Sequence, residues 1–295
     1  MKRDFIPGSE WLYFKIYTGF KTADNILIHK ILPMTNHLTV QKMIDKWFFI
    51  RYSDPNFHLR LRLKINDFAY YNEIFKLFSS SFDYTLESGL VTKIMCDTYS
   101  RELERYGDKL IDISETFFCI DSIYILQILE SLINSVDPDK DRWCISLKLI
   151  DDILNSFEFS LQNKCDLLLE LSKDYKKEFG FTNQTQIDQI NNKYRTNRST
   201  IDNCFDENSL VKDYEYFIKE RFEKIKPLSQ QIIKGYIGDR NNLISHIKSL
   251  IHMTMNRLFR SSNRTYELVI YDFLYRYYKS SIARNKNKSS KLIVE

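Results

Sequence analysis

The sequence predicts an α+β fold, in which a mixed sheet in the N-terminal third packs against a mainly helical remainder. Two observations predict this class. Runs rich in β-branched and aromatic residues are concentrated in the first hundred residues, as is typical of strands. From about residue 100 onward, apolar residues recur instead at helical spacing. A sheet accompanied by helices that lie mostly outside the strand-rich region belongs to the α+β class.

Four strands are expected in the N-terminal third, at 11–17 (WLYFKIY), 47–53 (WFFIRYS), 58–64 (HLRLRLK) and 90–99 (LVTKIMCDTY). The short segment SDPNF links the second and third, and its Asp54 and Pro55 favour a turn, so these two strands should pair as a hairpin. Helices are expected between the strands, at about 24–36, broken by Pro33, and at about 67–80.

The remainder of the chain is expected to be helical and to form one domain with the sheet, over residues 1–295. Its helical segments are 121–135, 141–157, 160–179, 208–225, 242–259 and 264–282. The connector 180–208 is polar and turn-rich, which predicts a mobile loop. Basic and small residues near 284–295 predict a flexible tail.

Composition excludes several classes of function. The formal net charge is only +4, from 43 Lys and Arg against 39 Asp and Glu, so a nucleic-acid-binding protein is not indicated. Glycine occurs 7 times, with no phosphate-binding glycine motif, and the five cysteines form no C-x-x-C pair, so neither a nucleotide loop nor a metal site is expected. The N-terminus lacks the apolar core of a signal peptide, and no stretch approaches the ~18 apolar residues of a membrane span. A cytoplasmic protein without membrane insertion is therefore expected.

The strand HLRLRLK has one apolar face and one basic face. With a side-chain period of two, His58, Arg60, Arg62 and Lys64 share a face, and the leucines share the other. Arginine carries a rigid fork of donors that matches a carboxylate or phosphate, so this face could bind an anion. An exposed charged strand, or arginines paired with Glu on a neighbouring strand, would have the same pattern.

The segment DTYSRELERYG, residues 97–107, combines a carboxylate with several guanidiniums. If it is helical, Glu102 and Arg105 share a face at a spacing of three, and Arg101 and Arg105 share one at a spacing of four. The segment follows a predicted strand, and functional sites are often built at such corners. A surface helix with ion pairs is the alternative.

The segment NLISHIKSLIHMTMNRLF, residues 242–259, contains a histidine beside an apolar stripe. The stripe predicted to pack is Leu243, Ile247, Leu250, Ile251, Thr254 and Leu258, and a second stripe of small polar groups contains Ser245, Ser249, His252 and Asn256. This arrangement suggests that His252 lines a cavity, although many histidines in this position are ordinary core or surface residues. The three segments together supply the groups needed to bind a dicarboxylate and to move protons near it.

The chain resembles the C-terminal elimination domain of lantibiotic dehydratases, a group also labelled thiopeptide-type bacteriocin biosynthesis proteins. The matching stretches follow the family order and span nearly the whole chain: PGSEWLYFKIYTG (7–19), WFFIRYSDPNFHLRLRLK (47–64), DTYSRELERYG (97–107), DS (121–122) and HMTMNRLF (252–259). The resemblance implies a lyase that eliminates glutamate from glutamylated Ser or Thr of a ribosomally made precursor peptide. The products would be dehydroalanine or dehydrobutyrine, as in lanthipeptide or thiopeptide maturation, and neither a metal nor an organic cofactor would be required.

The resemblance also implies roles for individual residues. Arg60 and Arg62 match the family's R-x-R strand and would bind the glutamyl carboxylates. Glu102 and Arg105 match its E-x-x-R motif, and His252 matches the histidine of H-M-x-x-N-R. These three would be catalytic, and either His252 or Glu102 could be the base. Supporting roles are expected within the same motifs, at Arg101, Asn256, Arg257 and His58.

The implied partners are the precursor peptide and a separate tRNA-dependent glutamylation protein, because this chain is too short to hold the glutamylation domain. Direct tRNA binding is not expected of this chain, and analogy with full-length relatives suggests a homodimer. Two other functions stay open. Thiopeptide pyridine synthases use the same fold for a formal cycloaddition of two dehydroalanines and generally lack the elimination Glu and His, and a relative could also bind peptide without catalysis.

Overall fold

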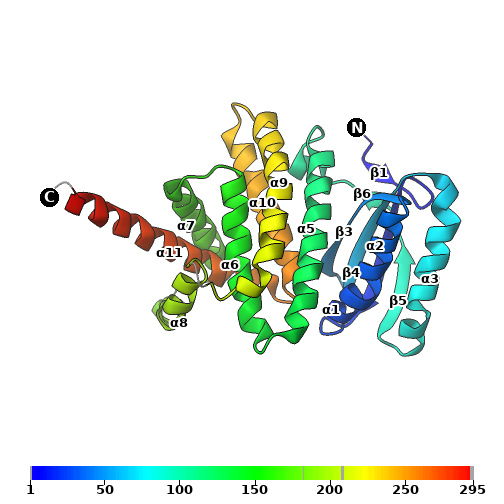
Figure 1. Ribbon diagram of the computed structural model, residues 1–295, viewed down its shortest axis with the longest axis horizontal. Coiled ribbons are helices and arrows are strands. Elements are labelled where there is room, and N and C mark those ends of the chain that lie inside the picture. The colour runs from blue at the N-terminus through cyan, green and yellow to red at the C-terminus, as the bar shows by residue number, and fades with distance from the viewer. Residues whose placement is uncertain (1, 182, 207–208, 293–295) are drawn as a thin grey trace. The chain divides into compact units, whose positions relative to one another are not determined.

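The computed structural model describes residues 2–181, 183–206 and 209–292, and it divides the chain into two compact units (Figure 1). Unit 1 comprises Met1–Asn134 and Glu223–Ser261, and unit 2 comprises Ser135–Phe222 and Ser262–Glu295. The strands all lie in the first hundred residues and helices dominate the rest, which confirms the α+β class. The single domain expected over 1–295 stays a prediction.

The sheet of unit 1 has four strands in the order β3-β4-β2-β5. These strands are β2 (Trp11–Thr18), β3 (Ile44–Ser53), β4 (Phe57–Ile65) and β5 (Val91–Cys96). The hairpin of β3 and β4 is confirmed, with Ser53 opposite Phe57. All three pairings are antiparallel, so the expectation of a mixed sheet is wrong. A further pair of two-residue strands, β1 (Asp4–Phe5) and β6 (Tyr99–Ser100), was predicted only in part.

Both faces of β4 are covered, each by a different helix. The leucine face is packed by α3 (Tyr71–Glu87), whose Phe78 stacks on Phe14 of β2 at 3.9 Å between ring centroids. The arginine face is reached by α5 (Ile111–Ser131), whose Phe118 contacts Phe48 of β3 at 5.4 Å. Because Phe14 is the cross-strand partner of Leu61 and Phe48 that of Arg62, these contacts identify the two faces.

The helical region near Pro33 is continuous, so the predicted break there is wrong. It consists of α1 (Ala23–Ile26), a π-helical turn (Leu27–Ile31) and α2 (Leu32–Val40). Pro33 lies in the first turn of α2, directly after the π-helical turn, whose wider backbone can accommodate the proline ring without ending the helix. The other helices that shape unit 1 are α4 (Leu103–Tyr106) and α10 (Arg240–Leu258).

Helix α5 begins ten residues before the predicted start and is strongly apolar. Residues Ile111–Asn134, within the described part of the chain, form one helix that is long and apolar enough to cross a membrane by length and composition. The sequence expectation that no such stretch exists is therefore wrong. Half of its apolar window is buried inside the protein, where it packs against β3 and α10. A helix that is buried on more than one side in the core of a protein has the same apolar composition as a membrane-spanning helix.

Unit 2 is helical throughout its described residues. Its main elements are α6 (Pro138–Ser156), α7 (Leu161–Glu178), α8 (Gln184–Asn203) and α11 (Asn263–Leu292), and α9 (Glu215–Gly235) begins in unit 2 and ends in unit 1.

The mobile loop predicted at 180–208 is wrong, because most of that segment forms α8. The Asn183 side chain accepts a hydrogen bond from the Gln186 N–H at 3.0 Å and so caps the helix. Ile190 and Ile201 are buried, and Tyr194 contacts Phe273 of α11 at 5.9 Å. The tail expected over 284–295 is helical as far as Leu292, where α11 ends, and residues 293–295 lie outside the described residues.

Candidate functional site

Arg62 is a buried arginine surrounded by aromatic rings. Its side chain is 8% exposed, and its guanidinium carbon lies 4.6, 5.2 and 4.9 Å from the ring centroids of Tyr13, Phe48 and Tyr99. The Nε of Arg62 is buried without a hydrogen-bond partner, and no carboxylate of the described chain lies within ion-pair distance of the guanidinium. Burial lowers the pKa of Arg62, yet an arginine stays protonated in proteins. The rings therefore hold a cation whose donors are available to an anion.

A small pocket connects Arg62 with the E-x-x-R motif. It has a volume of about 30 Å³ and is lined by residues of β3, β4, the Tyr99–Tyr106 segment, α5 and α10. Arg62 and Glu102 both line it, together with Tyr106 and with Met253, which directly follows His252. The structure thus brings one predicted arginine and the predicted carboxylate to the same pocket.

Glu102 and Arg105 form an ion pair of 3.1 Å between Oε2 and Nη1. Their side chains are 59% and 47% exposed, so the pair is screened by water and both groups can reach a ligand from solvent. The segment 97–107 is helical only at Leu103–Tyr106, with Glu102 at the N-cap position. The expectation that Arg101 and Arg105 share a helix face is therefore wrong.

Tyr106 lies in the pocket and was not singled out by the sequence analysis. Its side chain is buried, and burial, with a smaller contribution from Glu102, raises the pKa of Tyr106 to about 12. The phenol is therefore protonated at neutral pH and can donate a hydrogen bond. Only its position within the quoted motif DTYSRELERYG could have indicated it.

Arg60 is held by a neutral histidine and an aromatic ring, and it is not among the residues that line the pocket. Its Nε donates to Nε2 of His58 at 3.1 Å, and its guanidinium stacks over Tyr52 at 3.4 Å. Nδ1 of His58 lies 2.9 Å from the Asn56 carbonyl oxygen, which requires a proton on Nδ1 and leaves Nε2 as the acceptor. Burial lowers the pKa of His58, in agreement with a neutral ring. Across the strand pair, Arg60 lies opposite Ile50, which does line the pocket.

Arg101 is paired with carboxylates and is not among the residues that line the pocket. It bonds both carboxylate oxygens of Glu115, at 2.7 and 2.6 Å, and Asp112 at 2.7 Å. Glu115 also accepts from the hydroxyl of Tyr99 at 2.8 Å. Arg101 therefore acts on the pocket only indirectly. It pairs with Glu115, and Glu115 accepts a hydrogen bond from Tyr99, whose ring lies beside Arg62.

Asn256 and Arg257 close the outer edge of β3. The Asn256 amide accepts from the Arg51 N–H at 2.9 Å and donates to the Arg51 carbonyl at 2.8 Å, as a neighbouring strand would. Arg257 donates from Nε to the Phe49 carbonyl at 2.9 Å and pairs with Asp121 at 2.9 Å, with both partners fully buried. These two residues hold α10 against the sheet.

His252 lies on α10 and is not among the residues that line the pocket, although its neighbour Met253 is. The predicted packing stripe is buried from Ile247 to Leu258, while His252 and Asn256 are half-buried on the second stripe, as expected. His252 lies one turn before Asn256, the residue that contacts β3, and next to Met253, which lines the pocket. Its catalytic role stays a prediction.

A second histidine on α10, His246, was missed by the sequence analysis. It is fully buried, with Nε2 at 3.2 Å from the Ser114 hydroxyl and Nδ1 at 3.1 Å from the Tyr236 hydroxyl. Burial lowers the pKa of His246 to about 4, so the ring is neutral at pH 7. This network joins α5, α10 and the turn that directly follows α9 within unit 1, and it has a structural role.

Metal ligation is not indicated by the side chains that the structure describes. Within residues 2–181, 183–206 and 209–292, no group of three or more His, Cys, Asp or Glu side chains is arranged to hold a metal ion. The polar groups that line the pocket include the Arg62 guanidinium, the Glu102 carboxylate and the phenols of Tyr99 and Tyr106, and the guanidinium suits an anionic organic ligand.

Comparison with known proteins places the chain in a family. The family described as lantibiotic biosynthesis dehydratase C-term matches residues 11–278. Nisin biosynthesis protein NisB of Lactococcus lactis subsp. lactis is 27% identical over 284 residues, which cover 95% of this chain and 26% of NisB. Subtilin biosynthesis protein SpaB of Bacillus subtilis is 25% identical over 260 residues, covering 86% of this chain and 24% of SpaB. The chain thus spans about a quarter of the length of the curated relatives it matches.

Solved structures share the fold. The tRNA-dependent lantibiotic dehydratase MibB from Microbispora sp. 107891 superposes with a TM-score of 0.72 at 19% identity, covering 95% of this chain and 29% of MibB. TbtD, a pyridine synthase from thiomuracin biosynthesis, superposes with a TM-score of 0.63 at 12% identity, covering 92% of this chain and 99% of TbtD. From the match over residues 11–278, the chain belongs to the lantibiotic biosynthesis dehydratase C-terminal family.

Proposed function

We propose that this chain eliminates glutamate from glutamylated Ser or Thr side chains of a precursor peptide, leaving dehydroalanine or dehydrobutyrine. The observation that carries the proposal is the buried guanidinium of Arg62, which has no anionic partner in the described chain and shares a pocket with the Glu102 carboxylate. Burying an unpaired cation is costly, so its retention is best explained by an anionic ligand. The relatives named for nisin and subtilin biosynthesis make a peptide-derived ligand the natural choice.

The proposed reaction needs a base, an anion-binding group and a leaving carboxylate. The base removes the Cα proton, that electron pair forms the Cα=Cβ bond, and the Cβ–O bond breaks to release glutamate as a carboxylate. Arg62 would bind glutamate carboxylate and stabilise the charge that develops as the bond breaks. Glu102 and His252 are both candidates for the base, and Arg105 would orient the Glu102 carboxylate through their ion pair.

Arg60 would extend the cationic region along β4. Its guanidinium is held in one orientation by His58 and Tyr52, so little side-chain entropy would be lost when it binds a second carboxylate of the glutamyl group. Arg101, Asn256 and Arg257 would contribute by positioning, because each already donates hydrogen bonds to protein groups.

The test is to incubate the chain with a glutamylated precursor peptide and follow its mass. Loss of glutamate is expected with the wild-type chain. The rate of this loss should be lower by roughly 10²- to 10³-fold for Arg62→Ala and for His252→Ala. Arg198→Ala, which removes an exposed arginine of α8, is the matched control and should retain activity. Glutamyl esters that stay intact with the wild-type chain and its cognate peptide would contradict the proposal.

The second candidate is a formal cycloaddition of two dehydroalanines. The observation in its favour is that the chain covers 99% of the pyridine synthase TbtD. A dehydrated peptide that gains a pyridine chromophore on incubation with the chain would support it. A non-catalytic, peptide-binding role would be supported if a reaction mixture kept its turnover after Glu102, Arg105 and His252 had been substituted together.

The proposed partners are the precursor peptide and a tRNA-dependent glutamylation activity. With a formal net charge of +4, this chain offers little general attraction for tRNA, so salt-sensitive tRNA binding by the purified chain would contradict that part of the proposal. A homodimer and a cytoplasmic location stay predictions, which sedimentation and cell fractionation would test.

A further inference from the structure

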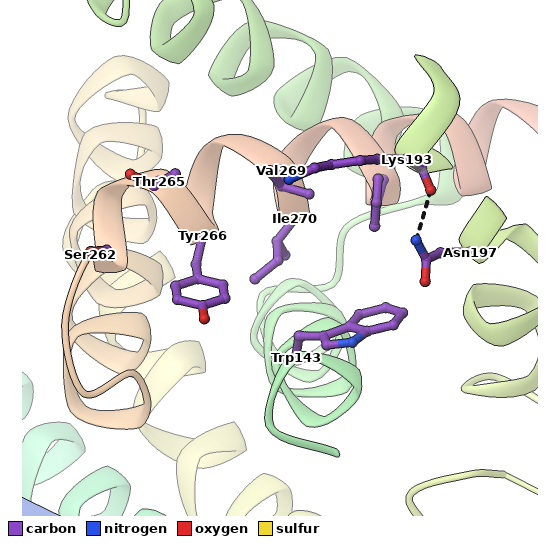
Figure 2. A pocket seen from close by; sticks show the side chains of 9 residues that line it. Trp143, Lys193, Asn197, Ser262, Thr265, Tyr266, Val269 and Ile270 are labelled. Atoms are coloured by element: carbon purple, nitrogen blue, oxygen red, sulfur yellow. Dashed lines mark hydrogen bonds between the residues drawn. The ribbon is translucent and has the colours of Figure 1, made fainter. Parts of the chain in front are cut away.

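Unit 2 contains a pocket that the proposed reaction does not use. It has a volume of about 470 Å³ and lies among α6, α8 and α11, as Figure 2 shows. This volume is within the range of sites that bind small molecules or one or two peptide side chains. Every residue that lines it belongs to unit 2, whereas the pocket at Arg62 is lined by unit 1 alone.

The walls of this pocket are largely apolar and include partly exposed rings. Trp143 of α6 is half-buried and makes an edge contact with Phe273 at 6.1 Å, while its indole lies along the pocket in Figure 2. Tyr266 of α11 is 41% exposed, and Val269 and Ile270 form the aliphatic part of the wall. Tryptophan and tyrosine at the wall of a pocket commonly provide a large share of the energy of binding.

One cation reaches into the apolar surroundings. Lys193 is exposed on α8, and Figure 2 shows its side chain extending toward Val269 of α11. Asn197 donates to the Lys193 carbonyl at 2.8 Å, one turn along the same helix. Among the described residues, no carboxylate lies within ion-pair distance of the Lys193 ammonium.

Three carboxylates on α8 and α11 have partners other than Lys193. On α8, Asp188 accepts from Gln184, and Asp202 pairs with Arg198. On α11, Asp272 pairs with basic residues of its own unit at 2.5 Å. The pocket therefore combines apolar walls with positive charge, and its complement is an apolar group next to a negative one.

We propose that this pocket binds a peptide segment in which a large apolar side chain lies next to a carboxylate. The apolar side chain contacts Trp143, and the carboxylate lies at Lys193. The chemistry of the occupant follows from the pocket, whereas its being a peptide rests on the proposed function, whose substrate is a peptide. The pocket then acts as a second point of attachment for the substrate, away from the reacting residue.

The fluorescence of Trp143 provides a direct test. The sequence has three tryptophans, and Trp11 and Trp47 are each 1% exposed in unit 1, so a ligand in this pocket should change the emission of Trp143 alone. We expect a saturable change when the full chain is titrated with N-acetyl-Phe-Glu-amide. N-acetyl-Phe-Lys-amide, which has the same ring and the opposite charge, should bind several-fold more weakly. The Trp143→Phe variant should lose the signal.

Two variants and one control test the assignment. Val269→Phe places a ring in the pocket and should weaken binding of the Phe-Glu dipeptide by at least roughly tenfold. Lys193→Glu should weaken it roughly three- to tenfold, the range for one solvent-exposed ion pair converted to repulsion. Arg195→Glu makes the same change of charge on α8 at a residue that does not line the pocket, and it should leave binding unchanged. Equal binding of the two dipeptides, or equal effects of Lys193→Glu and Arg195→Glu, would overturn the proposal.

The dipeptide experiment requires no turnover, so it separates this inference from the proposed function. Selective binding of the Phe-Glu dipeptide without elimination would refute the proposed reaction and retain the pocket. Elimination without any dipeptide binding would retain the reaction and refute the pocket. If both hold, Lys193→Glu should raise KM for a glutamylated peptide that contains a Phe-Glu segment and leave kcat unchanged.

Discussion

Replacing Arg62 with methionine should strongly lower the rate of the proposed reaction without weakening the fold. Methionine has a similar length and no charge, so it can fill the space between the three rings. Most buried arginines have carboxylate partners, and their removal leaves a buried anion unpaired. Arg62 has no such partner among the described residues, so its removal leaves no carboxylate behind.

The expected change in stability follows from two opposing contributions. The guanidinium lies 4.6 to 5.2 Å from three ring centroids, and partly desolvated cation–π contacts contribute about 1 kcal/mol each, or about 3 kcal/mol together. Burying the charge costs several kcal/mol, on the order of 4 to 5. Arg62→Met should therefore raise the free energy of unfolding of unit 1 by about 1 to 2 kcal/mol. The rate of glutamate elimination should fall by roughly 10²- to 10³-fold.

Urea unfolding followed by tryptophan fluorescence provides the assay. In a Trp143→Phe background the remaining tryptophans, Trp11 and Trp47, both lie in unit 1, so the signal reports that unit. The matched control is Arg257→Met, which leaves the carboxylate of Asp121 fully buried without its cation and should cost about 3 to 5 kcal/mol.

Free glutamate should distinguish a binding role of Arg62 from a structural one. At ten times its Kd, a ligand of the folded state adds about 1.4 kcal/mol to the free energy of unfolding. This increase is expected for the wild-type chain and not for Arg62→Met. A loss of stability in Arg62→Met comparable to that of Arg257→Met, with glutamate stabilising both chains equally, would refute the reasoning.

Three further predictions concern the surroundings of the site. Burial lowers the pKa of His246 to about 4, from an ordinary value of about 6.5. As the pH falls, this histidine is therefore protonated in the unfolded chain before it is protonated in the folded chain. The free energy of unfolding is highest, as far as this group is concerned, above about pH 6.5, and it decreases as the pH falls toward 4. Between pH 7 and pH 5 the wild type should lose about 2 kcal/mol through this group, and His246→Gln, measured by urea unfolding, should not. Asn256→Ala removes two hydrogen bonds to the Arg51 backbone and should lower the free energy of unfolding by about 1 to 3 kcal/mol. The backbone amide of Arg51 should also exchange its hydrogen faster in this variant, and an unchanged exchange rate would contradict the prediction. His58→Leu removes the hydrogen-bond acceptor that orients Arg60 and should raise KM for the glutamylated peptide several-fold. His58→Gln keeps an acceptor, so its KM should lie closer to that of the wild type. Identical kinetics for the two variants would argue against a positioning role of His58.

Local sequence patterns were sufficient for most of the sheet and for the packing of α10. The four predicted strands lie within a few residues of β2 to β5, because alternation and β-branched or aromatic content directly reflect a pleated, partly buried backbone. The buried stripe of α10 was also predicted from spacing alone. Helix α8 was missed because its few apolar positions, such as Ile190 and Ile201, are separated by polar residues that are typical of loops.

Alternation in the sequence predicts which side chains share a face of a strand, whereas the packing of distant elements sets what each face contacts. Alternation along β4 places Arg60 and Arg62 together, but whether that face is exposed depends on α5, which begins more than forty residues later. In the sequence, nothing distinguishes the surroundings of Arg101 from those of Arg62, because each is an arginine within a motif that contains further charged residues. Arg101 has carboxylates of α5 as partners, whereas Arg62 is bordered by rings and has no carboxylate of the described residues within ion-pair distance. This difference depends on the electrostatics of groups distant in sequence, which no local spacing encodes.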